Sequence, residues 1–245
     1  MSISTLYNQN DSFSRDARLS KILWLIEDEL KNEKKCDILD VGCGDGKIGG
    51  ELVKMGHRVA GVDVSKKGIT EARDKGMDAT LSQIEEFDTE KKYDLIIMTD
   101  ILEHLFEPLD ALKKAKKWLR LDGKMAINFP NHFDLRNRFR MFLGRSIVHW
   151  DHNNLEAWDY QHIRFLTLTE LRKMVGLAGF YIEKEQFNFM GGGILPVKIT
   201  PSFLRYFLVR IWPSIFSGKF SLLLAPNKTG DITAKKYFTK TLKGM

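Results

Sequence analysis

The sequence predicts an α/β protein built on a doubly wound, Rossmann-like, mostly parallel sheet of seven strands with helices on both faces. Short apolar runs alternate with amphipathic stretches about every 20 to 30 residues, which is typical of strand–helix–strand units. A glycine-rich turn follows the first apolar run and leads into a helix. With 245 residues, 43% of them hydrophobic, the chain can bury one core of this kind. The ligand of such a domain lies at the carboxyl ends of its strands.

The first half of the chain alternates regularly. Apolar residues recur at helical spacing over 15–31, behind Ser14 as a candidate N-cap. Pro108 opens a later helix, where its missing N–H costs nothing. We expect strands over 36–41, 58–62, 77–81, 93–99 and 123–129, and further helices over 47–55, 65–75 and 108–119.

The second half departs from this alternation. Residues 131–166 are rich in aromatics, Arg and His, and we interpret them as a helical and aromatic cap inserted after the fifth strand. A helix over 167–177, a strand over 180–187 and an antiparallel last strand over 219–225 complete the fold. We therefore expect one domain over 1–226, with an N-terminal helical lid (1–34), the substrate cap (131–166), an apolar insertion (188–218) and a basic tail (227–245).

Composition excludes several classes of protein. Two cysteines, Cys36 and Cys43, are too few for a disulfide scaffold and favour the reducing cytoplasm. The polar first 18 residues contain no signal-peptide core, and no apolar run is long enough to span a membrane.

The net charge of +6 is concentrated in one stretch. Ten Lys and Arg lie between residues 113 and 145, against Asp122 and Asp134. The lysines fit the solvated face of a helix, whereas Arg136, Arg138 and Arg140 follow a strand end and suit an anionic substrate or membrane surface.

The most specific motif is Asp40-Val41-Gly42-Cys43-Gly44-Asp45-Gly46, between a strand and a helix. Glycines at alternate positions let the backbone turn tightly and approach a ligand. Its G-x-G-x-G spacing differs from the dinucleotide fingerprint. Asp63 ends the next strand, where a carboxylate can accept hydrogen bonds from both ribose hydroxyls.

With these residues the chain resembles the class I S-adenosylmethionine-dependent methyltransferases, and most closely the group that contains ubiquinone-type O-methyltransferases and the methionine-biosynthesis W-type proteins. Four further segments carry the resemblance: the strand Tyr93-Asp94-Leu95-Ile96-Ile97, Asp100-Ile101-Leu102-Glu103-His104-Leu105 followed by Pro108, the fifth strand and its exit over 121–131, and the block 162–167 with Leu171 and Gly179-Phe180. The resemblance implies S-adenosylmethionine as cofactor and S-adenosylhomocysteine as product.

The resemblance also implies roles for matching residues. Asp40 and the turn would face the methionine part of the cofactor, Asp63 the ribose, and Val64 the adenine. Gln83 stands where relatives often have an acid beside the adenine. The full expected cofactor set is Asp40, Gly42, Cys43, Gly44, Gly46, Asp63, Val64, Gln83, Ile84, Thr99 and Asp100.

Methyl transfer from a sulfonium needs an aligned nucleophile and exclusion of water. We expect no metal, because the spacing His149-x-x-His152 is unspecific. An oxygen nucleophile benefits from a general base, for which histidine is suited near neutral pH. The candidate catalytic residues are His104, His152 and His162.

Three functions stay open from the sequence. The first is transfer to a small-molecule, glycan or lipid-linked acceptor, at oxygen. The second is a nucleic-acid methyltransferase that uses the basic 113–145 stretch, although no base-flipping signature follows the fourth strand. The third is a non-catalytic regulatory subunit that only binds the cofactor.

The apolar segment 203–216 allows different partners. Its two arginines and its aromatics suit peripheral contact with the inner face of a membrane. Alternatively, it covers the sheet or forms the interface of a homodimer, so that the protein is either a monomer or a homodimer.

Overall fold

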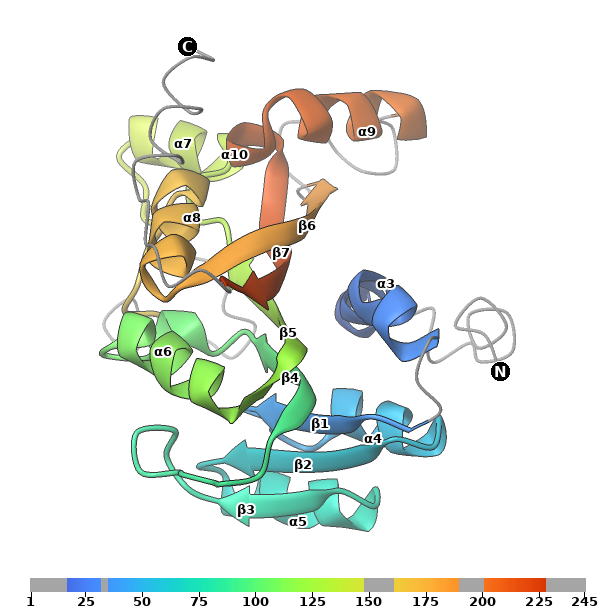
Figure 1. The fold of residues 1–245 in the computed structure, drawn as a ribbon. Helices are drawn as coiled ribbons and strands as arrows, with labels where there is room; N and C mark the ends of the chain where they lie inside the picture. The colour runs from blue at the N-terminus through green and yellow to red at the C-terminus, as the bar shows by residue number, and fades with distance from the viewer. Residues whose placement is uncertain (1–16, 32–34, 148–160, 190–200, 228–245) are drawn as a thin grey trace.

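A computed structural model describes residues 17–31, 35–147, 161–189 and 201–227. It contains one seven-stranded sheet with the order β3-β2-β1-β4-β5-β7-β6 (Figure 1). Only β7 runs antiparallel to its neighbours, β5 and β6. The doubly wound, mostly parallel fold with an antiparallel last strand is therefore confirmed. The strand order reverses between β1 and β4, and the crevice beyond their carboxyl ends is the expected ligand site.

The elements agree closely with the sequence pattern. In chain order they are α3 (Ala17–Lys31), β1 (Asp37–Val41), α4 (Lys47–Lys54), β2 (Arg58–Asp63), α5 (Lys66–Asp74), β3 (Asp78–Leu81), β4 (Tyr93–Thr99), the 3₁₀ turn η1 (Leu102–His104), α6 (Pro108–Trp118), β5 (Leu119–Pro130), α7 (Leu135–Phe142), α8 (Leu168–Leu177), β6 (Phe180–Phe189), α9 (Ser202–Ile211), α10 (Pro213–Phe216) and β7 (Ser217–Pro226).

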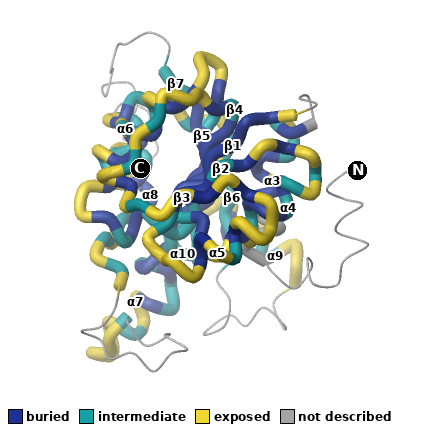
Figure 2. The backbone as a smooth tube through the Cα atoms, turned by 90° about the horizontal axis from the view of Figure 1, so that it is seen from below, coloured by how far each residue is buried: buried dark blue, intermediate teal, exposed yellow. Residues whose placement is uncertain are grey.

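The sheet is buried on both faces because its central strands are apolar on both sides. Leu39 and Val41 of β1 pack in the core beneath α6 and α8. Ile38 packs in a second core with α3, α4 and α5. The alternation follows from the two-residue period of a strand. Figure 2 shows this continuous dark-blue centre enclosed by partly exposed helices.

The largest difference from a predicted strand boundary is at the start of β5, whereas the other strand ends shift by at most two residues. β5 begins at Leu119 rather than at Gly123, and α6 ends at Trp118. Leu119 pairs with Tyr93 before the register shifts, and a Cβ at Gly123 would lie 2.8 Å from the Tyr93 carbonyl oxygen. The alternation of apolar and polar residues along a strand does not reveal an irregular pairing of this kind.

The structure describes only part of the lid, the cap, the apolar insertion and the tail that the sequence predicts. The buried side chains of α3, such as Leu23 and Ile26, lie in the sheet core, and none lines the cavity described below. The lid function of 1–34 stays a prediction, because 1–16 and 32–34 lie outside the described residues. The cap contains α7, whose N-cap Asp134 accepts a hydrogen bond of 2.8 Å from the Asn137 N–H. Residues 148–160, 190–200 and 228–245 also lie outside the described part.

The basic stretch is divided by the fold among α6, β5 and α7, and α6 and α7 lie well apart in Figure 1. Several α6 lysines are engaged locally: Lys116 donates to the Gly179 carbonyl and Lys114 to that of Glu85. Within the described residues, no helix is long and apolar enough to cross a bilayer.

Candidate functional site

The glycine turn connects β1 to α4 through three residues in the left-handed region. Gly42, Gly44 and Gly46 have φ values of 73°, 52° and 72°. A Cβ at Gly42 would lie 2.6 Å from Ile101 Cδ1, and one at Gly46 would lie 2.7 Å from Ala72 Cα. A Cβ at Gly44 would meet nothing within 4 Å. Gly46 therefore serves the packing of α4 on α5, whereas Gly44 leaves open space at the turn.

Asp40 lies near the end of β1 and is buried, and its Oδ1 has no hydrogen-bond partner among the described residues. Burial, followed by the charges of Asp63 and Asp45, raises the pKa of Asp40 to about 7, although the Gly49 N–H donates to its carboxylate. A buried acceptor without a donor is costly. A ligand cation or ordered donor near this carboxylate would remove that cost.

The Cys43 side chain belongs to the core rather than to the cavity. It packs on β2, where a Cβ added to Gly61 would lie 2.8 Å from its Sγ. Burial raises the pKa of its thiol to about 12, so it is no nucleophile. Any part of Cys43 in cofactor binding would fall to its backbone.

Asp63 ends β2 and organises the turn. Its Oδ2 accepts a hydrogen bond of 2.8 Å from the Gly44 N–H, and its Oδ1 accepts one of 2.8 Å from the Ser65 N–H. Each carboxylate oxygen can accept a further bond. Asp63 is therefore held in place beside the turn, and its two oxygens can still accept hydrogen bonds from a ligand.

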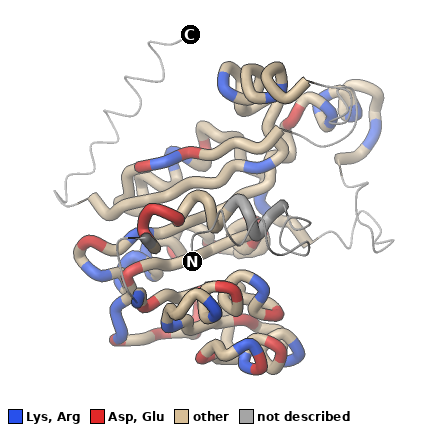
Figure 3. Tube along the Cα trace, turned by 90° about the vertical axis from the view of Figure 1, so that its right-hand side faces the viewer, with Lys and Arg blue, Asp and Glu red and all other residues tan. Residues whose placement is uncertain are grey.

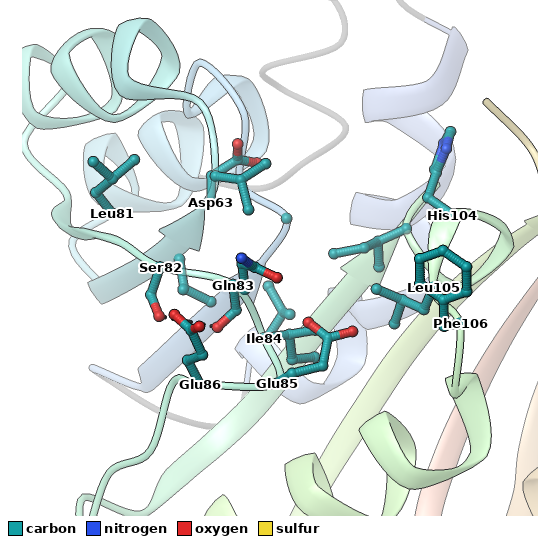
Figure 4. A pocket seen from close by; sticks show the side chains of 15 residues that line it. Asp63, Leu81, Ser82, Gln83, Ile84, Glu85, Glu86, His104, Leu105 and Phe106 are labelled. Carbon is teal, nitrogen blue, oxygen red and sulfur yellow. Dashed lines mark hydrogen bonds between the residues drawn. The ribbon is translucent and has the colours of Figure 1, made fainter. Parts of the chain in front are cut away.

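A cavity of about 550 Å³ opens beyond the carboxyl ends of β1, β2 and β4. Figure 4 shows Asp63 and Gln83 on one side of it and His104, Leu105 and Phe106 on the other. Of the predicted cofactor residues, it is lined by Gly42, Asp63, Val64, Gln83 and Ile84.

Sequence reasoning missed two acids on this cavity. Glu85 and Glu86 follow Gln83 and Ile84 in the loop after β3 and also line it. Their only sequence signal is the position of this loop next to the expected adenine contact.

Thr99 and Asp100 end β4 but are not among the residues that line the cavity. Asp100 adopts a φ of 50° and accepts two hydrogen bonds of 2.7 Å from Lys219 Nζ of β7. A positive φ in a residue other than glycine costs energy and concentrates at functional sites. Lys219 was not predicted as a site residue, because nothing local links β7 to the end of β4.

Three histidines meet beside the cavity, and we call His104, His132 and His162 the histidine cluster. His104 lines the cavity, and its Nδ1 lies 3.2 Å from the Gln161 carbonyl oxygen. Because that oxygen can only accept, the contact assigns the neutral form of His104 the tautomer with the proton on Nδ1 and the lone pair on Nε2. The ring of His162 meets that of His104 edge to face at 4.7 Å. The third predicted catalytic histidine, His152, lies outside the described residues.

His132 is buried and adjoins His162, with 2.9 Å between His132 Nε2 and His162 Nδ1. Burial, together with the charges of His162 and Lys219, lowers the pKa of His132 to about 4. His132 is therefore neutral at physiological pH. The sequence shows a histidine-rich cap but offers no way to tell which of its members meet.

Glu103 precedes His104 and is buried, with Oε2 lacking a hydrogen-bond partner. Burial raises the pKa of Glu103 to about 8. Its carbonyl oxygen accepts the N–H groups of Ile163 and Arg164, at 2.9 and 3.1 Å. These bonds attach the segment containing His162 to η1.

Ligand atoms of Glu103, His104 and His162 all lie within 4.8 Å of one another. Such a set is compact enough to hold a metal ion. Our expectation of a metal-free site therefore stays a prediction.

The fold and this arrangement can be compared with known proteins. A family model described as "Methyltransferase domain" matches residues 14–185. The chain belongs to this methyltransferase family. It is a class I S-adenosylmethionine-dependent methyltransferase, as its sequence motifs indicated, and its cofactor is S-adenosylmethionine.

Among curated relatives, this methyltransferase is 26% identical over 177 residues to the ubiquinone biosynthesis O-methyltransferase of Hydrogenovibrio crunogenus, covering 69% of this chain and 68% of the relative. It is 26% identical over 142 residues to the protein of the same name from Bradyrhizobium diazoefficiens, covering 56% of this chain. The match spans 54% of the length of the Bradyrhizobium protein.

Solved structures support the fold. The methyltransferase resembles the magnesium protoporphyrin IX methyltransferase of Synechocystis PCC 6803, with a TM-score of 0.56, 17% identity and coverage of 91% and 98% of the two chains. It also resembles the 1,6-didemethyltoxoflavin-N1-methyltransferase of Burkholderia thailandensis, with a TM-score of 0.56, 17% identity and coverage of 92% and 85%.

Proposed function

We propose that this methyltransferase transfers a methyl group to a hydroxyl oxygen of a small-molecule, glycan or lipid-linked acceptor by in-line displacement. The proposal rests on the cavity. Asp63 and Gln83 line one of its walls, and His104 lines the opposite wall. Residues of the proposed cofactor site and a candidate base thus line one cavity. The O-methyltransferase names of the curated relatives support oxygen as the acceptor atom.

The residues present fit the cofactor in charge and shape. Gly44 leaves space that a side chain would fill, and the orphaned Asp40 carboxylate suits an ammonium group. Asp63 would accept from the ribose hydroxyls, and Gln83 would hydrogen-bond the adenine edge. When bound, the cofactor supplies an activated methyl group.

The histidine cluster would supply the base. His104 has its Nε2 lone pair free to accept a proton because its Nδ1–H donates to the Gln161 carbonyl. The buried, neutral His132 would hold the His162 ring in place. Leu105, which is buried beside His104, would help to exclude water from the reacting atoms.

The cofactor assignment is tested by calorimetric titration with S-adenosylmethionine and S-adenosylhomocysteine, with NAD as control. We expect micromolar binding of the first two and none of NAD. Asp63→Ala should weaken binding at least tenfold, since it removes both the ribose acceptor and the support of the turn. Asp110→Ala, on exposed α6, is the matched control. Unchanged affinity in Asp63→Ala would refute the site.

The acceptor is tested with prenylated phenols that carry a free hydroxyl, followed by glycans, with release of S-adenosylhomocysteine as readout. His104→Gln should lower kcat by a factor of about 10² or more with cofactor affinity unchanged. A pH profile in which the variant loses the ascending limb would identify the base. Full activity of His104→Gln with every accepted substrate would remove it from the mechanism. Repeating the assay with a chelator shows whether activity also depends on a metal ion bound by Glu103, His104 and His162.

A further inference from the structure

The exposed apolar side chains of this protein are concentrated at one end. Half of the large hydrophobic residues described as exposed belong to α7 and α9 or follow them directly: Phe139, Met141, Phe142, Leu143, Phe203, Tyr206, Phe207, Ile211 and Trp212. Phe142 is 84% exposed and Phe203 is 74% exposed. Soluble proteins rarely leave large contiguous apolar patches uncovered, and such patches mark interaction sites.

The two helices lie at the same end of the molecule. Figure 1 shows α7, α10 and α9 together at the upper end, beyond the carboxyl end of β5. The side chain of Asn131, just before α7, donates to the carbonyl oxygens of Ser214 and Ser217 at 3.1 and 2.6 Å. These bonds fasten the start of the α7 segment to α10 and the start of β7. We call the exposed faces of α7 and α9 the aromatic–arginine surface.

α9 is amphipathic in the sense required of an interfacial helix. Val209 is buried and faces β6, whereas Phe203, Tyr206, Phe207 and Ile211 are exposed at spacings of three and four residues. An isolated soluble helix would carry charged residues on this outer face. Trp212 and Tyr206 are residues that favour the boundary between lipid and water.

The charge of this surface has one sign. Residues 135–147 and 201–218 contain six arginines and no acidic residue. Arg138 donates to the Phe133 carbonyl, Arg140 to that of Ser146, and Arg210 to the Tyr206 hydroxyl. Among the described residues, no carboxylate forms an ion pair with these three. In Figure 3 most of this end is tan and its charged segments are mainly blue, whereas blue and red segments are mixed around β1–β3.

These observations favour an anionic lipid surface over other occupants. A second copy of the chain docked face to face would place the arginines against one another. A nucleic acid would pair with the arginines but leave the largely exposed Phe142 and Phe203 without an apolar environment. An anionic bilayer suits both the arginines and the exposed apolar side chains. Headgroup phosphates pair with Arg, while aromatic and aliphatic side chains enter the boundary of the acyl region.

We propose that the aromatic–arginine surface formed by α7 and α9 docks this methyltransferase peripherally on membranes that contain anionic lipids. His132 lies three residues before α7, so docking would hold the histidine cluster near the bilayer. The corollary that the acceptor is borne by a lipid rests on the proposed function, whereas docking itself does not.

The test is co-sedimentation of the full chain with vesicles of phosphatidylcholine alone or mixed equally with phosphatidylglycerol, at low and high salt. We expect binding to the mixed vesicles only, weakened by salt. Arg138→Glu/Arg210→Glu, with one change on each helix, should reduce the bound fraction at least tenfold, and Phe142→Ser should reduce it severalfold. The matched controls are Lys113→Glu/Lys117→Glu on α6 and Leu121→Ser, whose side chain is 78% exposed on β5.

Three results would overturn the proposal. The first is no binding to the mixed vesicles, and the second is equal binding by the arginine variant. The third is a wild-type dimer in light scattering that Phe142→Ser dissociates, because the surface would then be a self-interface. Titration of each variant with S-adenosylhomocysteine reports separately on the cofactor site, so failure of docking and failure of the proposed function are distinguishable.

Discussion

Glu103 illustrates how a single buried carboxyl makes stability depend on pH. Its pKa lies near 4.5 in an unfolded chain and rises to about 8 in the folded protein because of burial. The stability contributed by its protonated form is fully present below pH 4.5 and is lost as the pH rises through about 8. We expect Glu103→Gln to gain roughly 2 to 4 kcal/mol relative to wild type between pH 5 and pH 9, at about 1.4 kcal/mol per pKa unit. Urea unfolding at both pH values measures this, and a constant difference would contradict the assignment.

Asp40 makes a second prediction at the residue scale, this time on binding. With its pKa raised to about 7, the carboxyl is partly protonated at neutral pH. A cofactor ammonium near it would favour the ionised form, so binding should release protons and strengthen as the pH rises through 7. Calorimetry in buffers of different ionisation enthalpy counts the released protons. Asp40→Asn should abolish the proton release that comes from this carboxyl. Any protons released by the ligand itself should be measured with both proteins.

At the scale of the element, two glycines of the same turn are expected to have different roles, Gly46 in helix packing and Gly44 in ligand binding. Gly46→Ala places a Cβ against Ala72 of α5 at a φ of 72°, and we expect a loss of about 2 to 4 kcal/mol of stability. Gly44→Ala meets no protein atom, so only about 1 kcal/mol should be lost. Gly44 donates its N–H to Asp63, which lines the cavity. We expect the proposed cofactor to lie against this turn, so the added methyl group should lower S-adenosylhomocysteine affinity at least tenfold. Chemical denaturation and calorimetry of both variants check the contrast; equal affinity in Gly44→Ala and wild type would move the ligand away from the turn.

At the scale of the whole molecule, the cavity draws residues from β1, β2, η1 and the loop after β3. A ligand there would connect segments far apart in sequence and should stabilise the domain as a unit. We expect S-adenosylhomocysteine at 100 times its dissociation constant to add about 2.7 kcal/mol to the free energy of unfolding. A thermal shift that grows with the logarithm of ligand concentration supports this, and a flat response would contradict it. NAD is the control.

The sequence by itself determined the strand–helix order, because strand and helix periods, Pro108 and the glycine turn are local signals. Tyr93–Thr99 was predicted to the residue, and the helix expected over 65–75 spans Lys66–Asp74, with Ser65 as its N-cap. The irregular start of β5 was missed because pairing with Tyr93 is not local. Asp63, Gln83 and Ile84 were expected near a ligand, and all three line the cavity.

Only the tertiary structure decided which distant side chains meet. It joined His132 to His162 and His104, paired Lys219 with Asp100, and removed the Cys43 side chain from the cavity. It also placed α7 and α9 at the same end of the molecule, although more than 60 residues separate Asp134 from Ser202. Backbone propensity and apolar period act over a few residues and are readable from the chain. Side-chain partnerships across the sheet depend on how strands pair and helices pack, and these are properties of the folded molecule alone.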